Sequence, residues 1–121
     1  MWRFVVLRHE PGPASTRELH WDLMLEDDSD LRTWALVSEP KPDATIVAIE
    51  LPNHRKDYLV YEGPVSGERG SVTRFDHGTY SLIRESSDEV AIELNGQRLR
   101  AAVTLQRCSD DQRWLVAFDD G

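Results

Sequence analysis

Cysteine is almost absent from this sequence of 121 residues, which contains only Cys108. A single cysteine forms no internal disulfide and cannot supply the several thiolates of a structural zinc site. Long apolar runs are also missing, because no stretch approaches the roughly 20 residues of a membrane-spanning helix. The apolar stretch near the N-terminus is too short for a signal peptide. We therefore expect a cytoplasmic protein without a membrane partner, and we expect it to be a monomer.

Positive charge is scarce as well, since 14 Lys and Arg stand against 22 Asp and Glu, for a formal net charge of −8. Proteins that bind nucleic acids usually neutralise phosphates with clustered basic side chains. A role on DNA or RNA therefore requires this chain to gather its basic residues on one face. The hydrophobic content of 40% is ordinary for a folded protein. The length predicts a single domain that spans residues 1–121.

Apolar and polar residues alternate with a period of two along much of the chain, and no segment has a convincing helical period. The first predicted strand runs for about seven residues from Trp2. The others are predicted at 18–26, 31–37, 45–51, 71–75, 78–85, 89–94, 98–107 and 113–118. About nine short strands at such close spacing predict an all-β, mainly antiparallel barrel or sandwich.

Turn signals separate several of these strands. Asn95-Gly96 is the strongest hairpin signal, because both residues tolerate a positive φ. Asp76-His77-Gly78 is interpreted as a turn, and so is the glycine-rich stretch from Gly63 to Gly70, which has no following helix that could bind a phosphate. The tryptophans alternate with polar residues, so we assign all of them to the core: Trp2, Trp21, Trp34 and Trp114.

His20-Trp21-Asp22 is the most informative triplet for chemistry. Residues i and i+2 of a strand project to the same side, so His20 and Asp22 can converge on one ion while Trp21 points into the core. An imidazole nitrogen and a carboxylate oxygen together suit manganese or zinc. His9 and His54, near the ends of other predicted strands, are candidates to complete such a site. The structural alternative is a half-exposed histidine that bonds to its carboxylate neighbour.

Several short segments stand in an order that is typical of one family. They are Phe4-Val5-Val6 with His9, Leu19 to Glu26, Leu31 to Ala35, Ala48 to His54 with Asp57-Tyr58, Tyr61-Glu62-Gly63 with Gly67 and Gly70, Asp76 to Tyr80, and Trp114-Leu115-Val116. Together they resemble the 3′-phosphoesterase domain found at the N-terminus of bacterial DNA ligase D. The resemblance runs almost from end to end.

This resemblance implies a small closed or flattened β-barrel of about eight to nine short strands with little helix. It also implies a manganese-dependent site, with zinc as the alternative, that removes a 3′-ribonucleoside and then the 3′-phosphate from nucleic-acid ends. Carried over by position, His9, His20 and Asp22 would hold the metal. His54 would contact or protonate the phosphoryl group, and Tyr58 would support it.

The sequence departs from the family at three positions that carry phosphate-binding cations. Two family arginines fall on Met24 and Ile46, and a family lysine falls on Ser38. A guanidinium makes bidentate, charge-assisted contacts that a thioether cannot replace. His9 and His20 are also separated by 10 residues, a longer spacing than in the family.

Three interpretations follow. The first is an active phosphoesterase that acts on nucleic-acid 3′ ends or on a smaller phosphate ester, with the missing cation supplied by Arg55, Arg69 or Arg74. The second is a metal-binding barrel that has lost catalysis and serves as a binding module, with a separate ligase or polymerase as its partner. The third is a barrel without metal, in which His20 and Asp22 are only a structural pair. A cation near the site separates the first two, and metal affinity separates the third from both.

Overall fold

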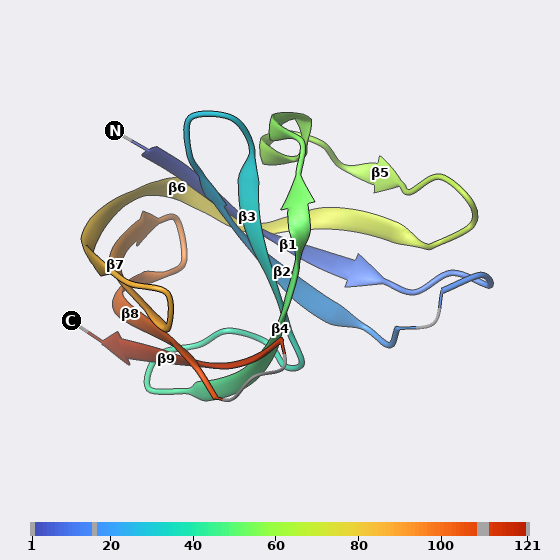
Figure 1. The fold of residues 1–121 in the computed structure, drawn as a ribbon. Helices are drawn as coiled ribbons and strands as arrows, with labels where there is room; N and C mark the ends of the chain where they lie inside the picture. Colours follow the sequence, from blue (N-terminus) through green and yellow to red (C-terminus); the bar gives the residue numbers. More distant parts are fainter. Residues whose placement is uncertain (1, 16, 109–111, 121) are drawn as a thin grey trace.

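The computed structural model describes residues 2–15, 17–108 and 112–120, and strands make up almost all of its regular structure (Figure 1). The elements are β1 (Trp2–Glu10), β2 (His20–Glu26), β3 (Leu31–Leu36), β4 (Thr45–His54), the 3-10 helix η1 (Lys56–Leu59), β5 (Gly63–Pro64), β6 (Ser71–Glu85), β7 (Glu89–Gly96), β8 (Arg100–Arg107) and β9 (Arg113–Asp120). The predicted all-β fold is confirmed. Within these ranges, no helix is long and apolar enough to cross a membrane.

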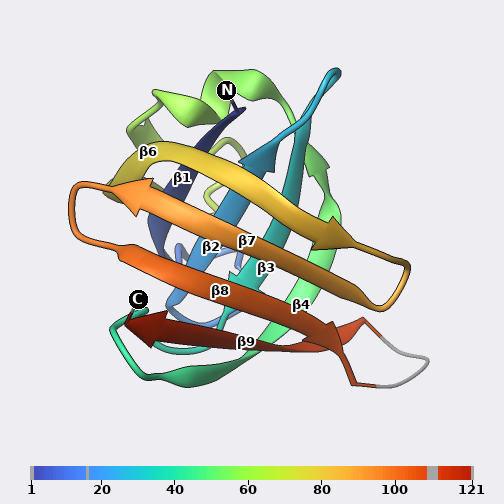
Figure 2. The ribbon, with the colours of Figure 1, turned by 90° about the vertical axis from the view of Figure 1, so that its left-hand side faces the viewer.

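The strands close into a barrel built from two meanders. β1 to β4 pair in chain order, and so do β6 to β9. The pairs β4–β9 and β1–β6 join the two meanders, so eight of the described strands form the closed wall and β5 adds a short extra pair to β6. Figure 2 shows β6 to β9 crossing in front of β1 to β4. The closed barrel predicted from the family resemblance is therefore confirmed.

The barrel interior holds the main core. Trp34 and Trp114 are fully buried, with ring centroids 5.5 Å apart in an edge-to-face arrangement, and Trp21 is 8% exposed. Burying a side chain of this size stabilises the fold by roughly 2–3 kcal/mol. The core assignment is wrong for Trp2, which is 39% exposed. Trp2 alternates in phase with the buried Phe4, but it is the first residue of β1 and lies beyond the side chains that fill the interior.

Residues 71–85 form one continuous strand, β6. The predicted turn at Asp76-His77-Gly78 is wrong, because β1 pairs along the first part of β6 and β7 pairs along the second. Their pairings overlap from Gly78 to Tyr80, so the backbone stays extended through the predicted turn. His77 lies opposite Val5 in the sheet.

The β7–β8 hairpin is present, but its turn lies two residues later than predicted. Asn95 and Gly96 belong to β7, and the amide of Gly96 donates to the carbonyl of Leu99 across a loop formed by Gln97-Arg98. The buried Asp76 carboxylate accepts hydrogen bonds from three backbone amides of this turn, those of Gln97, Arg98 and Leu99. A Cβ on Gly96 would overlap this carboxylate. Gly96 is therefore needed for the close approach of Asp76.

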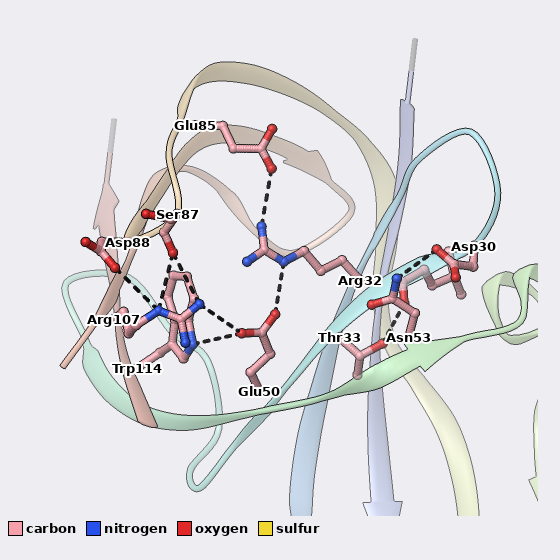
Figure 3. A network of polar contacts seen from close by, with 11 residues as sticks. Asp30, Arg32, Thr33, Glu50, Asn53, Glu85, Ser87, Asp88, Arg107 and Trp114 are labelled. Atoms are coloured by element: carbon pink, nitrogen blue, oxygen red, sulfur yellow. Dashed lines mark hydrogen bonds and ion pairs between the residues drawn. The ribbon is translucent and has the colours of Figure 1, made fainter. Parts of the chain in front are cut away.

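A charged network lies on the inward side of β4 (Figure 3). Glu50 accepts hydrogen bonds from Arg32 Nε and from Trp114 Nε1, each at 3.1 Å. The guanidinium groups of Arg32 and Arg107 lie 5.4 and 4.7 Å from the Trp114 ring centroid. Glu50 thus compensates two cations that pack on one buried indole, and the network ties β3, β4, β8 and β9 together.

A second, smaller apolar cluster lies on the outer face of β1 and β2, where η1 covers the barrel wall. Its buried members are Val5, Leu7, Met24, Leu31, Leu59 and Val72. Asp22 precedes Met24 by two residues on β2 and faces the same way. The segment from η1 to β5 therefore forms a roof over the part of the wall that carries the candidate site.

Candidate metal centre

The hairpin of β1 and β2 brings His9 directly opposite His20. Leu7 lies opposite Asp22 in the same register. The imidazole rings of His9 and His20 have centroids 4.7 Å apart. The long spacing between the two histidines therefore does not separate them, because the extra residues form the loop that connects the strands.

His9, His20 and Asp22 form one cluster, in which the candidate ligand atoms all lie within 4.8 Å of one another. His9 Nδ1 is 3.5 Å from Asp22 Oδ2, and His20 Nε2 is 3.2 Å from Asp22 Oδ1. His20 is 7% exposed and Asp22 is 2% exposed. As predicted from the alternation, the intervening Trp21 points into the barrel core.

The outer nitrogen of each histidine contacts a backbone carbonyl. His20 Nδ1 is 2.8 Å from the oxygen of Glu18, and His9 Nε2 is 2.9 Å from the oxygen of Arg69. Because a carbonyl only accepts, these nitrogens carry the protons. In the neutral rings, the lone pairs of the inner nitrogens therefore face the Asp22 carboxylate. This arrangement of outer carbonyls is typical of metal-binding histidines.

When both rings are neutral, acceptor atoms from three side chains meet at the centre of the cluster. Asp22 Oδ1 is buried and has no hydrogen bond within the described residues. Burial alone would lower the pKa of His20, but the Asp22 carboxylate outweighs burial and raises that pKa. Burial would likewise raise the pKa of Asp22, but His20 and His9 lower it. Bonds of about 2.1 Å to a shared metal ion place its ligands roughly 3.0–3.4 Å apart. The two nitrogen–oxygen separations, 3.2 and 3.5 Å, are close to this range, whereas the whole set of ligand atoms lies only within 4.8 Å.

A cavity of about 210 Å³ opens beside this cluster. His9, Asp22, His54, Tyr58 and Arg69 all contribute to its lining. His54 Nδ1 donates to the carbonyl of Pro52 at 2.9 Å, which leaves Nε2 available for a proton transfer. The His54 and Tyr58 rings pack edge to face with centroids 5.5 Å apart. Four of the five residues predicted for the site therefore line one cavity, and the fifth, His20, lies against Asp22 but outside that lining.

Arg69 brings a cation to this cavity. Its guanidinium Nε donates to the carbonyl of Ser66 at 2.8 Å, and Nη2 lies 3.2 Å from Ser66 Oγ. Arg55 lines a neighbouring cavity that shares Tyr58 and Val65 with this one. Arg74 lies opposite Leu7 on β6. Of the three arginines proposed from the sequence, Arg69 is the one placed in the lining together with Asp22 and His54.

Glycines hold the Arg69 loop against the β1–β2 connection. Gly70 has a φ of +101°, and a Cβ at that position would overlap the carbonyl of Glu10. The amide of Ala14 donates to the carbonyl of Glu68 at 3.0 Å. The loop thereby presents the Arg69 carbonyl to His9 and the Arg69 side chain to the cavity. The sequence pattern showed the glycines but not this contact between distant loops.

A bulge in β4 corrects one predicted departure from the family. Leu31 pairs with His54 and Thr33 pairs with Leu51, so β4 contains one extra residue between these pairs. The bulge reverses the side on which the earlier residues of β4 point. Ile46 is therefore 3% exposed inside the barrel core, although it precedes the outward-facing His54 by an even number of residues. Ile46 does not take the place of a phosphate-binding cation.

The other two departures have different positions. Met24 is 1% exposed and lines the cavity beside Asp22, so an apolar side chain does stand where the family carries an arginine. Ser38 is exposed in the loop after β3.

Comparison with known sequences agrees with this geometry. The sequence model of the DNA Ligase D 3′-phosphoesterase domain matches residues 13–107. The chain belongs to this family. The phosphoesterase match includes every candidate site residue except His9, which lies just before it. Membership therefore identifies the chain as a 3′-phosphoesterase-family domain.

Named relatives extend over nearly the whole chain. A multifunctional non-homologous end joining protein LigD from Mycobacterium bovis is 36% identical over 123 aligned positions, which cover 93% of this phosphoesterase-family chain and 15% of the relative. The Mycobacterium tuberculosis protein has the same values. A LigD protein from Pseudomonas aeruginosa is 27% identical over 98% of this chain and 15% of its own length. The chain thus spans about 15% of the length of the relatives it matches.

Proposed function

We propose that this chain is a metal-dependent phosphoesterase that removes phosphate from nucleic-acid 3′ ends. The metal is manganese, with zinc as the alternative, and its ligands are His9 Nδ1, His20 Nε2 and the Asp22 carboxylate. A divalent cation held by these three residues would polarise a phosphate oxygen and would lower the pKa of a bound water. Family membership supports the reaction class, and the cluster supports the metal dependence.

One observation carries this proposal most strongly. Two imidazole lone pairs face a carboxylate that is 2% exposed, and one of its oxygens has no hydrogen bond within the described residues. Buried acceptors that face one another are costly unless a proton or a metal cation lies between them. A purely structural His20–Asp22 pair would not require His9 to turn its own lone pair to the same carboxylate.

The remaining cavity residues have separate roles in hydrolysis of the phosphate ester. Hydrolysis forms a bond from water oxygen to phosphorus and breaks the bond to the 3′ oxygen, which needs a proton to leave as a hydroxyl. His54 Nε2 supplies this proton, since Nδ1 is fixed on Pro52. Tyr58 orients the His54 ring through their edge-to-face contact. Arg69 binds the non-bridging phosphate oxygens.

The alternative function is a catalytically impaired binding module of the same family. Met24 favours it, because this apolar side chain lies on the cavity wall beside Asp22. The position of Arg69 favours the active enzyme, since its guanidinium lines the cavity from the loop between β5 and β6 and can bind a phosphate there. A separate ligase or polymerase partner, a cytoplasmic location and a monomeric state are further parts of the proposal that rest on the sequence.

The test is manganese-dependent hydrolysis of a primer–template that ends in a 3′-phosphate. We expect phosphate release by the wild type and none by Asp22→Ala or His54→Ala. Asp76→Asn is a matched control, because it changes a buried aspartate that lies outside the cavity lining. Metal binding without phosphate release at high enzyme concentration would favour the binding module. Absence of both would favour the barrel without metal.

A further inference from the structure

A pocket of about 220 Å³ opens at one end of the barrel, between the β2–β3 turn and the end of β6. Its floor consists of buried side chains that belong to the main core: Leu25, Trp34, Tyr80 and Val90. Among the described residues, it shares no lining residue with the cavity beside the candidate metal centre. We call this pocket the barrel mouth. It is separate from the site described above, and the proposed reaction does not use it.

The floor of the barrel mouth contains a polar group without a partner. Trp34 is fully buried, and its indole N–H makes no hydrogen bond within the described residues, whereas the indole N–H of Trp114 donates to Glu50. The guanidinium of Arg32 lies 4.7 Å from the Trp34 ring centroid, but it offers donors and no acceptor. A buried donor that is left unpaired is costly. A guest that brings an acceptor to the floor would remove this cost.

The rim of the barrel mouth is acidic. Asp27, Asp28 and Glu85 line it, and Arg32, the cation in the same lining, is already paired with Glu85 (Figure 3). The Asp27 carboxylate accepts hydrogen bonds from two backbone amides of its own turn and forms no ion pair within the described residues. Burial and the nearby carboxylates, Asp27 first among them, raise the pKa of Tyr80 to about 12. The rim therefore favours a positively charged guest.

Apolar side chains continue the rim onto the outer surface. Trp2 and Leu82 line the rim and are 39% and 49% exposed, and the next residue, Ile83, is 54% exposed. A small free cation would leave these side chains in contact with water, whereas a protein segment would cover them. The pocket itself is smaller than the ~300 Å³ of typical ligand sites and suits one side chain. The guest that fits is therefore part of a larger molecule.

We propose that the barrel mouth docks a basic segment of a partner protein. An apolar side chain of that segment enters the pocket, and a neighbouring lysine or arginine pairs with Asp27 and Asp28 at the rim. Methionine matches the floor best, because its thioether is a weak acceptor for the Trp34 N–H and packs well against aromatic rings. Docking there leaves the cavity at His9 and Asp22 open, so it is compatible with the proposed function and does not depend on it.

The test is an NMR titration of the chain with three end-blocked tripeptides. Lysine–methionine–lysine should bind about tenfold more tightly than glutamate–methionine–glutamate, and about fivefold more tightly than lysine–serine–lysine. It should also move the indole N–H resonance of Trp34. In Asp28→Lys, which reverses one exposed charge at the rim, its affinity should fall about fivefold. The matched control is Glu93→Lys, because Glu93 is exposed on β7 outside the barrel mouth and the change in net charge is the same.

Each contrary result overturns a stated part of the inference. Equal binding of the lysine and glutamate peptides, or an unchanged Trp34 resonance, would show that the barrel mouth does not recognise the segment. An equal loss of affinity in Asp28→Lys and Glu93→Lys would mean that only the net charge of the chain acts. If n-butylammonium binds as tightly as lysine–methionine–lysine, the pocket takes a free organic cation and the partner segment is rejected. None of these outcomes involves a bound metal or hydrolysis, so failure of the proposed function leaves the test intact.

Discussion

Substitution of Arg69 tests whether a cation from a different part of the fold replaces those of the family. In the described residues, Arg69 forms no ion pair with a carboxylate, and its guanidinium contacts only Ser66 through two of its five N–H groups. The other donors are available for phosphate oxygens. A hydrogen bond to a charged group contributes about 1.5–3 kcal/mol, and the exposed position of Arg69 favours the low end of that range.

Arg69→Ala should therefore weaken transition-state binding by about 1.5–2 kcal/mol, which is a 10- to 30-fold loss in kcat/KM. Metal affinity should not change, because the contact to His9 comes from the Arg69 backbone carbonyl. Arg69→Lys should give an intermediate loss, since it keeps the charge but not the planar fork. The assay is steady-state release of the 3′-phosphate together with a manganese titration of each variant.

Arg84→Ala is the matched control, because it removes one exposed arginine that pairs with Glu89 away from the cavity. It should have unchanged kinetics. An Arg69→Ala enzyme with the same kcat/KM as the wild type would refute the argument. So would a loss of activity that is fully explained by weaker metal binding.

Three further predictions concern stability. Hydrogen bonds from Arg3 lower the pKa of Glu26 from 4.5 to about 2, so this pair should stabilise the fold fully above pH ~4.5 and lose its effect as the pH falls through 2. Solvent screens this exposed pair. Urea unfolding of Arg3→Met should show a lower stability than the wild type at pH 6 and almost no difference near pH 2, and an equal loss at both pH values would contradict this. Gly70→Ala should lower the melting temperature and weaken metal binding, because the new Cβ displaces the loop that contacts His9. Gly67→Ala is the control: its positive φ is also unfavourable for alanine, but its Cβ meets no close atom, so metal binding should change little. Glu50→Ala should cost about 1–3 kcal/mol, because it removes the acceptor of the Trp114 N–H and leaves Arg32 and Arg107 with only Glu85 and Asp88 as carboxylate partners. Glu50→Gln should cost less because it still accepts the Trp114 N–H, and equal costs would rule out a role for that hydrogen bond.

Local alternation was enough to predict how His20, Trp21 and Asp22 are arranged. The period of two places Trp21 in the core and the other two side chains outside, and regular pairing of β2 preserves that pattern. His9 and His54 were candidates from their places near strand ends, and the family resemblance assigned their roles, but their positions relative to Asp22 depend on contacts between strands. The cluster geometry itself, with its carbonyl partners, required the structure.

The errors arose where long-range pairing overrides a local signal. Asp76-His77-Gly78 has the composition of a turn, but β1 and β7 hold it in a strand, and Asp76 binds the backbone of a distant hairpin. The family resemblance placed Ile46 at the position of a phosphate-binding arginine, whereas the bulge in β4 turns Ile46 into the core. Arg69 could be proposed from its charge, but only the packing of two glycine-containing loops places it beside His9.

Anomalous diffraction from crystals grown with manganese tests the central claim most directly. The account predicts one strong peak between His9 Nδ1, His20 Nε2 and the Asp22 carboxylate, at bonding distances of about 2.0–2.3 Å. The peak should disappear in crystals of Asp22→Asn. Full manganese occupancy at another position, or an empty cluster in protein that hydrolyses 3′-phosphates, would contradict it.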